Sequence, residues 1–179
     1  MPETPATLQT QRLLLRRWKP SDIAPFIRMN AEADVMRFFP APLSPAQTRQ
    51  SYARIQAEFE ACGYGLFAAE TLESGDFIGF IGFHRAQFAA SFCPCIEIGW
   101  RLDSRYWGNG YATEGANACL KHGFSQLGFT EIYSFTAALN KPSERVMQKI
   151  GMQFHQHFDH PAVAEGHILR PHICYKISK

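Results

Sequence analysis

The chain has no long apolar run. Although 46% of its 179 residues are hydrophobic, no stretch approaches the roughly twenty consecutive apolar residues that a membrane-spanning helix requires. No apolar segment follows a charged start near Met1, so nothing indicates a secretory signal. We therefore expect a soluble, cytoplasmic protein that makes no membrane contact.

An excess of one charge and a regular cysteine pattern are also absent. The formal net charge is only +2, and the densest basic cluster is Arg16, Arg17 and Lys19, which is too small to indicate a nucleic-acid partner. Five cysteines are an odd number without the spacing of a disulfide-stapled scaffold, which suits a reducing compartment.

Metal-ligand spacing is missing too. Cys93-Pro94-Cys95 lacks the two-residue spacer of zinc knuckles, and no second cysteine pair follows it. His155 and His157 would share one face of a strand by its period of two, but no carboxylate or cysteine stands at a matching spacing. We expect no metal site.

The length suits one domain over residues 1–179. Hydrophobic periodicity predicts a mixed α/β sheet, because helical and strand patterns alternate along the chain. Expected strands lie at 13–18, 65–71, 77–87, 96–102, 131–138, 153–158 and 172–177. Expected helices lie at 21–30, 33–38, 112–127 and 143–150, with one more that opens at the capping box Ser44-Pro45-Ala46-Gln47, runs through Ala61 and ends at Gly63.

The most informative segment is a strand that runs through a glycine-bearing turn into a small-residue helix, residues 96–115. Glycines 108 and 110 let backbone N–H groups approach an anion, and the helix dipole adds positive potential there, so the turn suits a phosphate. A P-loop would need a lysine after Gly110, and a dinucleotide fingerprint would need glycine at Thr113. What remains is Arg105-x-x-Gly108-x-Gly110-x-Ala112.

This remainder resembles the pyrophosphate-binding signature of the GNAT acyltransferase superfamily. The likeness continues in Asn140-x-x-Ser143 and Gly151-Met152, and in residues 10–16 and 77–82, which resemble the branch containing the ribosomal-protein N-terminal acetyltransferases. It implies a single-domain mixed, mostly antiparallel sheet with splayed central strands flanked by helices. It also implies acetyl-CoA as co-substrate.

The resemblance assigns roles to residues of the strand, the turn and the next strand end. Backbone N–H groups of the turn would bind the pyrophosphate, Asn140 would hydrogen-bond the pantetheine arm, and the backbone of 100–102 would pair with that arm. The implied cofactor-binding set is Trp100, Arg101, Leu102, Arg105, Tyr106, Trp107, Gly108, Asn109, Gly110, Tyr111, Ala112 and Asn140.

The implied chemistry is acyl transfer from a thioester to a primary amine. Glu97 is the candidate base, because it is the one carboxylate within the apolar run Ile96 to Trp100; alternatively it faces solvent. Ser143 is the candidate acid for the leaving thiolate, or else only an N-cap. A backbone N–H near Leu102 would stabilise the oxyanion.

The branch implies a peptide N-terminal α-amine as acceptor. The alternative acceptor is a small amine, such as an amino acid, polyamine or antibiotic. Two alternative functions are a non-catalytic acyl-CoA sensor and a nucleotide-binding protein unrelated to CoA. The protein would act as a monomer or homodimer. Candidate acceptor-binding residues are Phe38, Phe39, Tyr64, Phe83, His84 and Trp107.

Overall fold

The computed structural model describes residues 7–179, which form one eight-stranded sheet in the order β1-β2-β3-β4-β5-β6-β8-β7. All neighbouring strands are antiparallel except β5 and β6, which are parallel. The strands are β1 (Thr7–Gln9), β2 (Leu13–Arg16), β3 (Leu66–Thr71), β4 (Phe77–Ala86), β5 (Cys95–Leu102), β6 (Glu131–Ala137), β7 (Gln153–Asp159) and β8 (Pro171–Ser178). The expected α/β fold, with its 65–71 and 77–87 hairpin, is confirmed.

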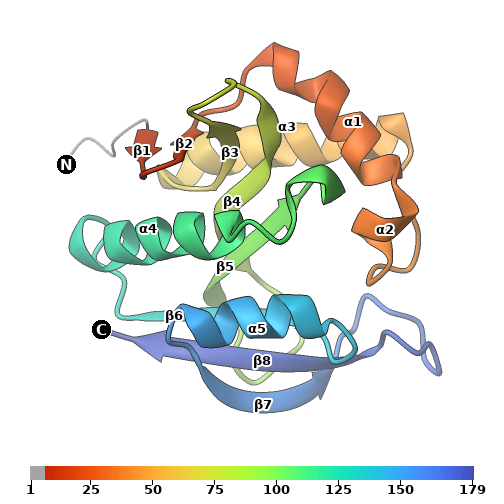
Figure 1. Cartoon of the computed structure of the whole chain (residues 1–179). Coiled ribbons are helices and arrows are strands. Elements are labelled where there is room, and N and C mark those ends of the chain that lie inside the picture. Colours follow the sequence, from red (N-terminus) through yellow and green to blue (C-terminus); the bar gives the residue numbers. More distant parts are fainter. Residues whose placement is uncertain (1–6) are drawn as a thin grey trace.

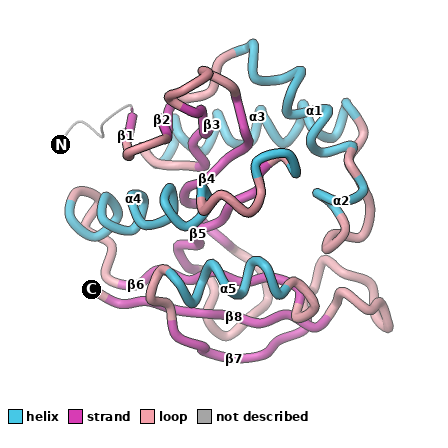
Figure 2. Tube along the Cα trace, viewed as in Figure 1, coloured by secondary structure: helices cyan, strands magenta, loops and turns pink. Residues whose placement is uncertain are grey.

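The helices cover both faces of this sheet. In Figure 1, α4 and α5 lie in front of the strands, whereas α3 crosses behind them and α1 packs on α3. Figure 2 shows the same layers, with helices in cyan and strands in magenta. The helices are α1 (Ile23–Ala31), α2 (Ala33–Met36), α3 (Pro45–Cys62), α4 (Tyr111–Ser125) and α5 (Lys141–Lys149), with single 3-10 turns at Pro20–Asp22 and Ser104–Tyr106.

Helix α3 begins and ends where its capping signals predict. The Ser44 side chain accepts a hydrogen bond from the Gln47 N–H, the Gln47 side chain accepts one from the Ser44 N–H, and Gly63 closes the helix with a φ of 74°. Boundaries without such signals are less accurate. The first predicted strand ends at Arg16 rather than 18, and a 3-10 turn replaces the start of the helix expected from 21.

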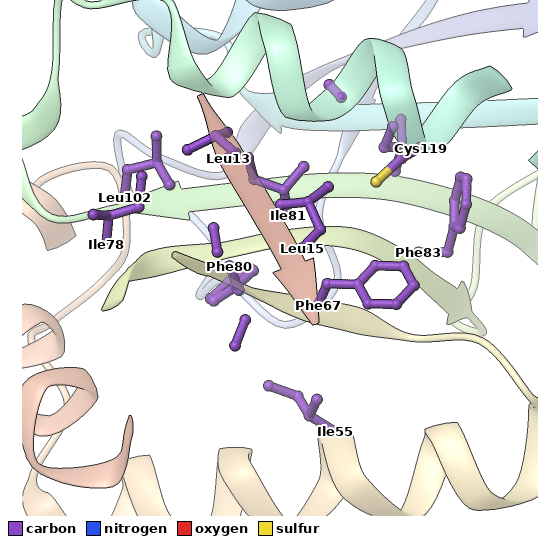
Figure 3. Close-up of a cluster of buried hydrophobic side chains, with 14 of the residues drawn as sticks. Leu13, Leu15, Ile55, Phe67, Ile78, Phe80, Ile81, Phe83, Leu102 and Cys119 are labelled. Atoms are coloured by element: carbon purple, nitrogen blue, oxygen red, sulfur yellow. The ribbon is translucent and has the colours of Figure 1, made fainter. Parts of the chain in front are cut away.

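The core fills both interfaces between sheet and helices (Figure 3). Cys119 of α4 packs on one face and Ile55 of α3 lies on the other. Two glycines let α4 approach the sheet: a Cβ on Gly115 would clash with Ile81, and one on Gly123 would lie 2.8 Å from the Phe83 ring. Close packing therefore offsets the cost of glycine within a helix.

Strands β5 and β6 diverge. Their one paired position joins Glu97 to Tyr133, so the part of β5 from residue 98 to 102 has no strand beside it on that side. This is the predicted splay, and it leaves a gap in the middle of the sheet.

The late hairpin carries an irregularity that the period-two argument missed. The pairing of β7 with β8 shifts between Phe154 and Gln156, so His155 stands at a bulge and simple alternation does not hold between it and His157. Over residues 7–179, no three His, Cys, Asp or Glu side chains gather as a metal site would require. Within the same span, no helix is long and apolar enough to cross a bilayer.

Gly79 should be the glycine on which the sheet depends most. Its φ is +137°, and a Cβ there would clash with the backbone carbonyl of Arg101. Gly79→Ala should lower the free energy of unfolding by about 3 kcal/mol or more, because neither backbone can move without breaking the ladder. Urea denaturation measures the change.

Gly99→Ala is the matched control on the adjacent strand. A Cβ there would meet nothing closer than a Glu97 carboxylate oxygen at 3.8 Å, so the free energy of unfolding should change by less than about 1 kcal/mol. Equal losses in the two variants would show that the close approach at Gly79 is not what limits the sheet.

Candidate functional site

A cleft of about 830 Å³ occupies the gap between β5 and β6. Its walls come from the turn before α4, the first turn of α5, the loop after α2, and both diverging strands. Lining residues come from both faces of the sheet, so the cleft passes through it.

The glycine turn forms one end of this cleft. Gly108 and Gly110 have φ values of 75° and 81°, and a Cβ on Gly108 would meet no atom within 4 Å. Gly110 is the N-cap of α4 and no described side chain caps the helix, so the N–H groups of its first turn are free for a ligand. These features fit the diphosphate of an acyl-CoA, since free backbone N–H groups and the helix dipole at the start of a helix favour an anion.

Side-chain contacts hold the turn in shape. The Arg105 guanidinium binds both oxygens of Asp103 at 2.9 and 2.7 Å, and these hydrogen bonds lower the pKa of the Asp103 carboxyl. The Asn109 amide donates to the carbonyls of Tyr106 and Trp107. Neither Arg105 nor Asn109 lines the cleft, so their side chains support the turn rather than face its ligand.

The exposed edge of β5 offers backbone groups to a ligand in the gap. The Asp103 N–H donates to Ile78 of β4, so by alternation the backbone groups of Trp100 and Leu102 point the other way, into the gap. The Leu102 carbonyl there already accepts a bond from the Trp107 indole at 2.9 Å.

For Arg101 the expected backbone role is wrong. Its carbonyl points to β4, where it would clash with a Cβ on Gly79. Its backbone is therefore paired within the sheet, and only its side chain reaches the cleft.

The first turn of α5 brings Asn140 and Ser143 to the cleft. Helix α5 begins at Lys141, earlier than predicted, because Asn140 is its N-cap: its side-chain oxygen accepts from the Ser143 N–H at 3.3 Å. The Asn140 amide nitrogen donates to Thr136 on β6 at 2.9 Å. Asn140 therefore fixes the helix to the strand end, and the capping role considered for Ser143 belongs to Asn140.

The Ser143 hydroxyl has a defined orientation. The Trp100 indole N–H donates to its oxygen at 3.0 Å, across the gap from β5. Because this bond uses a lone pair of the hydroxyl, the hydroxyl hydrogen stays available to another acceptor in the cleft.

Glu97 faces the cleft on the α3 side of the sheet. It is half-buried and lines the cleft between the strands, so it does not point away to bulk solvent as the alternative required. Burial raises the pKa of its carboxyl to about 7. Its cross-strand neighbour is His84, whose Nδ1 lies 2.8 Å from the Glu58 carboxylate of α3. That hydrogen bond raises the pKa of His84. A carboxylate with a pKa near neutrality can accept a proton from an amine.

The expected acceptor-binding residues divide into two groups. Phe39 and Trp107 are each 42% exposed and line the cleft, as do Phe38 and His84. Tyr64 and Phe83 do not line it: Phe83 is fully buried, and Tyr64 packs edge-on against Phe83 and Phe129. They belong to the core because both lie against the end of α4, away from the gap.

Sequence reasoning missed several lining residues. Phe80 was not predicted, and Arg101 was predicted only for its backbone, although alternation from Glu97 places its side chain on the same face of the sheet. His160 and His172 also line the cleft, with ring centroids 4.9 Å apart. No short-range signal indicates that the loop between β7 and β8 returns to the site.

Comparison with known proteins agrees with this geometry. Residues 12–153 match the family described as "Acetyltransferase (GNAT) domain". The chain is 34% identical to the uncharacterized protein YkkB of Bacillus subtilis over 82% of its own length and 85% of that protein.

Solved structures share the fold. A GNAT-family acetyltransferase from Bacillus anthracis superposes with a TM-score of 0.80 at 27% identity, covering 96% of this chain and 98% of that one. Mycobacterium smegmatis RimJ, solved with CoA-disulfide, superposes with a TM-score of 0.78 at 21% identity, covering 97% of this chain and 88% of that one. The glycine turn, the splayed strands and the family match together identify this chain as a member of the GNAT family and an acyl-CoA-dependent N-acetyltransferase.

Proposed function

We propose that this enzyme transfers an acetyl group from acetyl-CoA to a primary amine by direct attack, with Glu97 as base and Ser143 as acid. The observation that carries the proposal is that both side chains line the one cleft that begins at the glycine turn. Acetyl-CoA supplies the acetyl group as a thioester. The residues of the turn and the open edge of β5 bind and orient it.

Glu97 removes a proton from the acceptor amine. An alkyl amine is largely protonated at neutral pH, so attack requires a base. With a pKa of about 7, Glu97 is ionised above neutrality and can still hold a transferred proton. The charge of its neighbour His84 favours the ionised form of Glu97, whereas the carboxylate of Glu58 opposes it.

Ser143 donates a proton to the departing thiolate. Its oxygen accepts from Trp100, which leaves the hydroxyl hydrogen free to be donated. The Asn140 cap fixes the backbone of Ser143, so the hydroxyl is held in position before substrates bind.

The proposed acceptor is the α-amine of a peptide N-terminus. A protein with the same fold, RimL, supports this class by its name, a ribosomal L7/L12 alpha-N-protein acetyltransferase. The cleft is lined by exposed aromatic residues, Phe39 and Trp107, which suit an N-terminal side chain. Free-thiol release from acetyl-CoA with N-terminally varied peptides and small amines tests the proposal, and release with small amines only would exclude a peptide acceptor.

The glycine turn predicts a CoA-binding defect. Gly108→Glu places bulk and negative charge where the diphosphate would lie, so the affinity for CoA should fall at least about 100-fold by calorimetry. Gly128→Glu is the matched control: its φ of +70° gives the same backbone strain, and its Cβ also meets open space, but outside the cleft. If both variants bound CoA equally well, the turn would not be the diphosphate site.

Glu97 predicts a pH-dependent rate. For the wild type, kcat/KM should rise with pH through an apparent pKa of about 7 as the carboxyl ionises. Glu97→Gln should lower kcat/KM by about 100-fold or more and remove this rise, while CoA affinity stays the same. A wild-type profile flat between pH 6 and 9 would remove Glu97 from the mechanism.

Stability provides the control for this variant. The pKa of Glu97 is raised from 4.5 unfolded to about 7 folded, so the folded state binds the proton more tightly and its stability falls as pH rises from about 4.5 to 7. Glu97→Gln should therefore be more stable than wild type by about 1–3 kcal/mol at pH 8, and nearly equal at pH 4. If the variant is more stable than the wild type, its loss of activity is not caused by misfolding.

Ser143→Ala tests the acid. It should lower kcat at least about 10-fold without weakening CoA binding, because the hydroxyl acts on the leaving thiolate. Thr136→Val is a control: it removes a hydroxyl from the same cleft, one that accepts from Asn140 rather than from Trp100. Its kcat should change less than that of Ser143→Ala, and the reverse order would contradict the assignment.

A further inference from the structure

The side chain of Arg101 lines the cleft with a buried Nε and without a carboxylate partner. One terminal nitrogen donates to the Asn30 side chain at 2.9 Å, and Nε has no hydrogen-bond partner. Its guanidinium carbon lies 4.4 Å from the ring centroid of Phe39 and 5.3 Å from that of Phe80. Throughout residues 7–179, no Asp or Glu oxygen comes within 4.0 Å of it.

A second buried arginine shows what a structural site looks like in this protein. Arg16 is 6% exposed, and its guanidinium binds Asp22 at 2.8 Å and Glu70 at 2.6 Å. These partners raise the pKa of Arg16, whereas burial lowers that of Arg101 to about 10. Arg101 is still charged at neutral pH, so its buried charge lacks the compensation that Arg16 has.

The location of Arg101 points to the acceptor. It lies on the same face of β5 as Glu97, four residues along the strand, which corresponds to about 13 Å between their Cα atoms. Gly99 lies between them on that face and leaves the floor open. Both residues line the same cleft, so an acceptor whose amine reaches Glu97 has the Arg101 guanidinium on the same face of the strand.

The cofactor does not account for this guanidinium. The glycine turn offers backbone N–H groups to the diphosphate, and Ser143, Asn140 and the start of α4 lie on the opposite face of the sheet from Arg101. The other arginine and lysine residues that line the cleft are Arg37, directly after α2, and Arg145 and Lys149 of α5 on the opposite face.

We propose that Arg101 binds a carboxylate of the acceptor, so that the enzyme selects amines that carry an anionic group close to the reacting nitrogen. This inference rests on the proposed function and narrows its substrate class. This carboxylate has two chemical sources: the α-carboxylate of a free amino acid, or the acidic side chain of the first residue of a peptide.

Matched acceptor pairs test the inference. One arm compares free amino acids with their α-amides, and the other compares C-terminally amidated peptides that begin with aspartate or asparagine. Wild-type kcat/KM should favour the acid by about 10- to 100-fold in one arm, since a charge-assisted hydrogen bond is lost in the neutral member. The arm that shows the preference identifies the source.

Variants assign the preference to Arg101. Arg101→Gln should bring the acid-to-amide ratio close to 1, and Arg101→Lys should retain part of it. Arg49→Gln, an exposed arginine on α3, should leave the ratio at the wild-type value. Melting temperatures and CoA affinities are measured for every variant.

Binding is also measured without turnover. With CoA present, the acid member of at least one of the two pairs should raise the melting temperature of the wild type more than its neutral counterpart does, and this difference should be absent in Arg101→Gln. The inference would be overturned if wild-type kcat/KM showed no preference for the acid in either arm. It would also be overturned if Arg101→Gln lowered kcat/KM equally for acid and amide, or lowered CoA affinity by the same factor as kcat/KM. Absence of thiol release with every amine would instead contradict the proposed function, while the melting-temperature comparison would still decide on Arg101.

Discussion

The site depends on the divergence of β5 from β6. A parallel pair that stays together would satisfy the backbone groups of both strands and close the sheet. Here the strands pair at Glu97 and Tyr133, and the rest of β5 leaves its edge free. Everything functional follows from that unsatisfied edge: the glycine turn lies at the end of β5, and α5 begins beside the end of β6.

The protein keeps the gap open with a small number of directed contacts. Asn140 ties α5 to Thr136 of β6, and the indole of Trp100 reaches from β5 to Ser143. Tight packing of α4 on β4, made possible by Gly115 and Gly123, fixes the other wall. The cleft is thus held between rigid elements rather than between flexible loops, which favours preorganised chemistry.

Sequence patterns predicted the elements that carry local signals. The capping box of α3, the glycine turn and the apolar run of β5 are each formed by adjacent residues, and each predicted its element. The prediction for Tyr64 and Phe83 was wrong because the sequence pattern around an aromatic residue is the same whether the residue lines a cleft or packs in the core. The sequence offered Ser143 as a possible N-cap, whereas the N-cap is Asn140, because either residue type can cap a helix. His160 and His172 depend on how a long loop folds back, which no local pattern encodes.

The two faces of the sheet divide the site. Residues that suit the cofactor, such as Tyr111, Asn140 and Ser143, lie on the side of α4 and α5, whereas Phe39, His84 and Arg101 lie on the side of α1 to α3. In the proposed function the thioester and the acceptor therefore approach the cleft from different faces of the sheet, so both can be bound at once, which suits a ternary complex. Substitutions on the side of α1 to α3 can then change the acceptor while the thioester side keeps its chemistry.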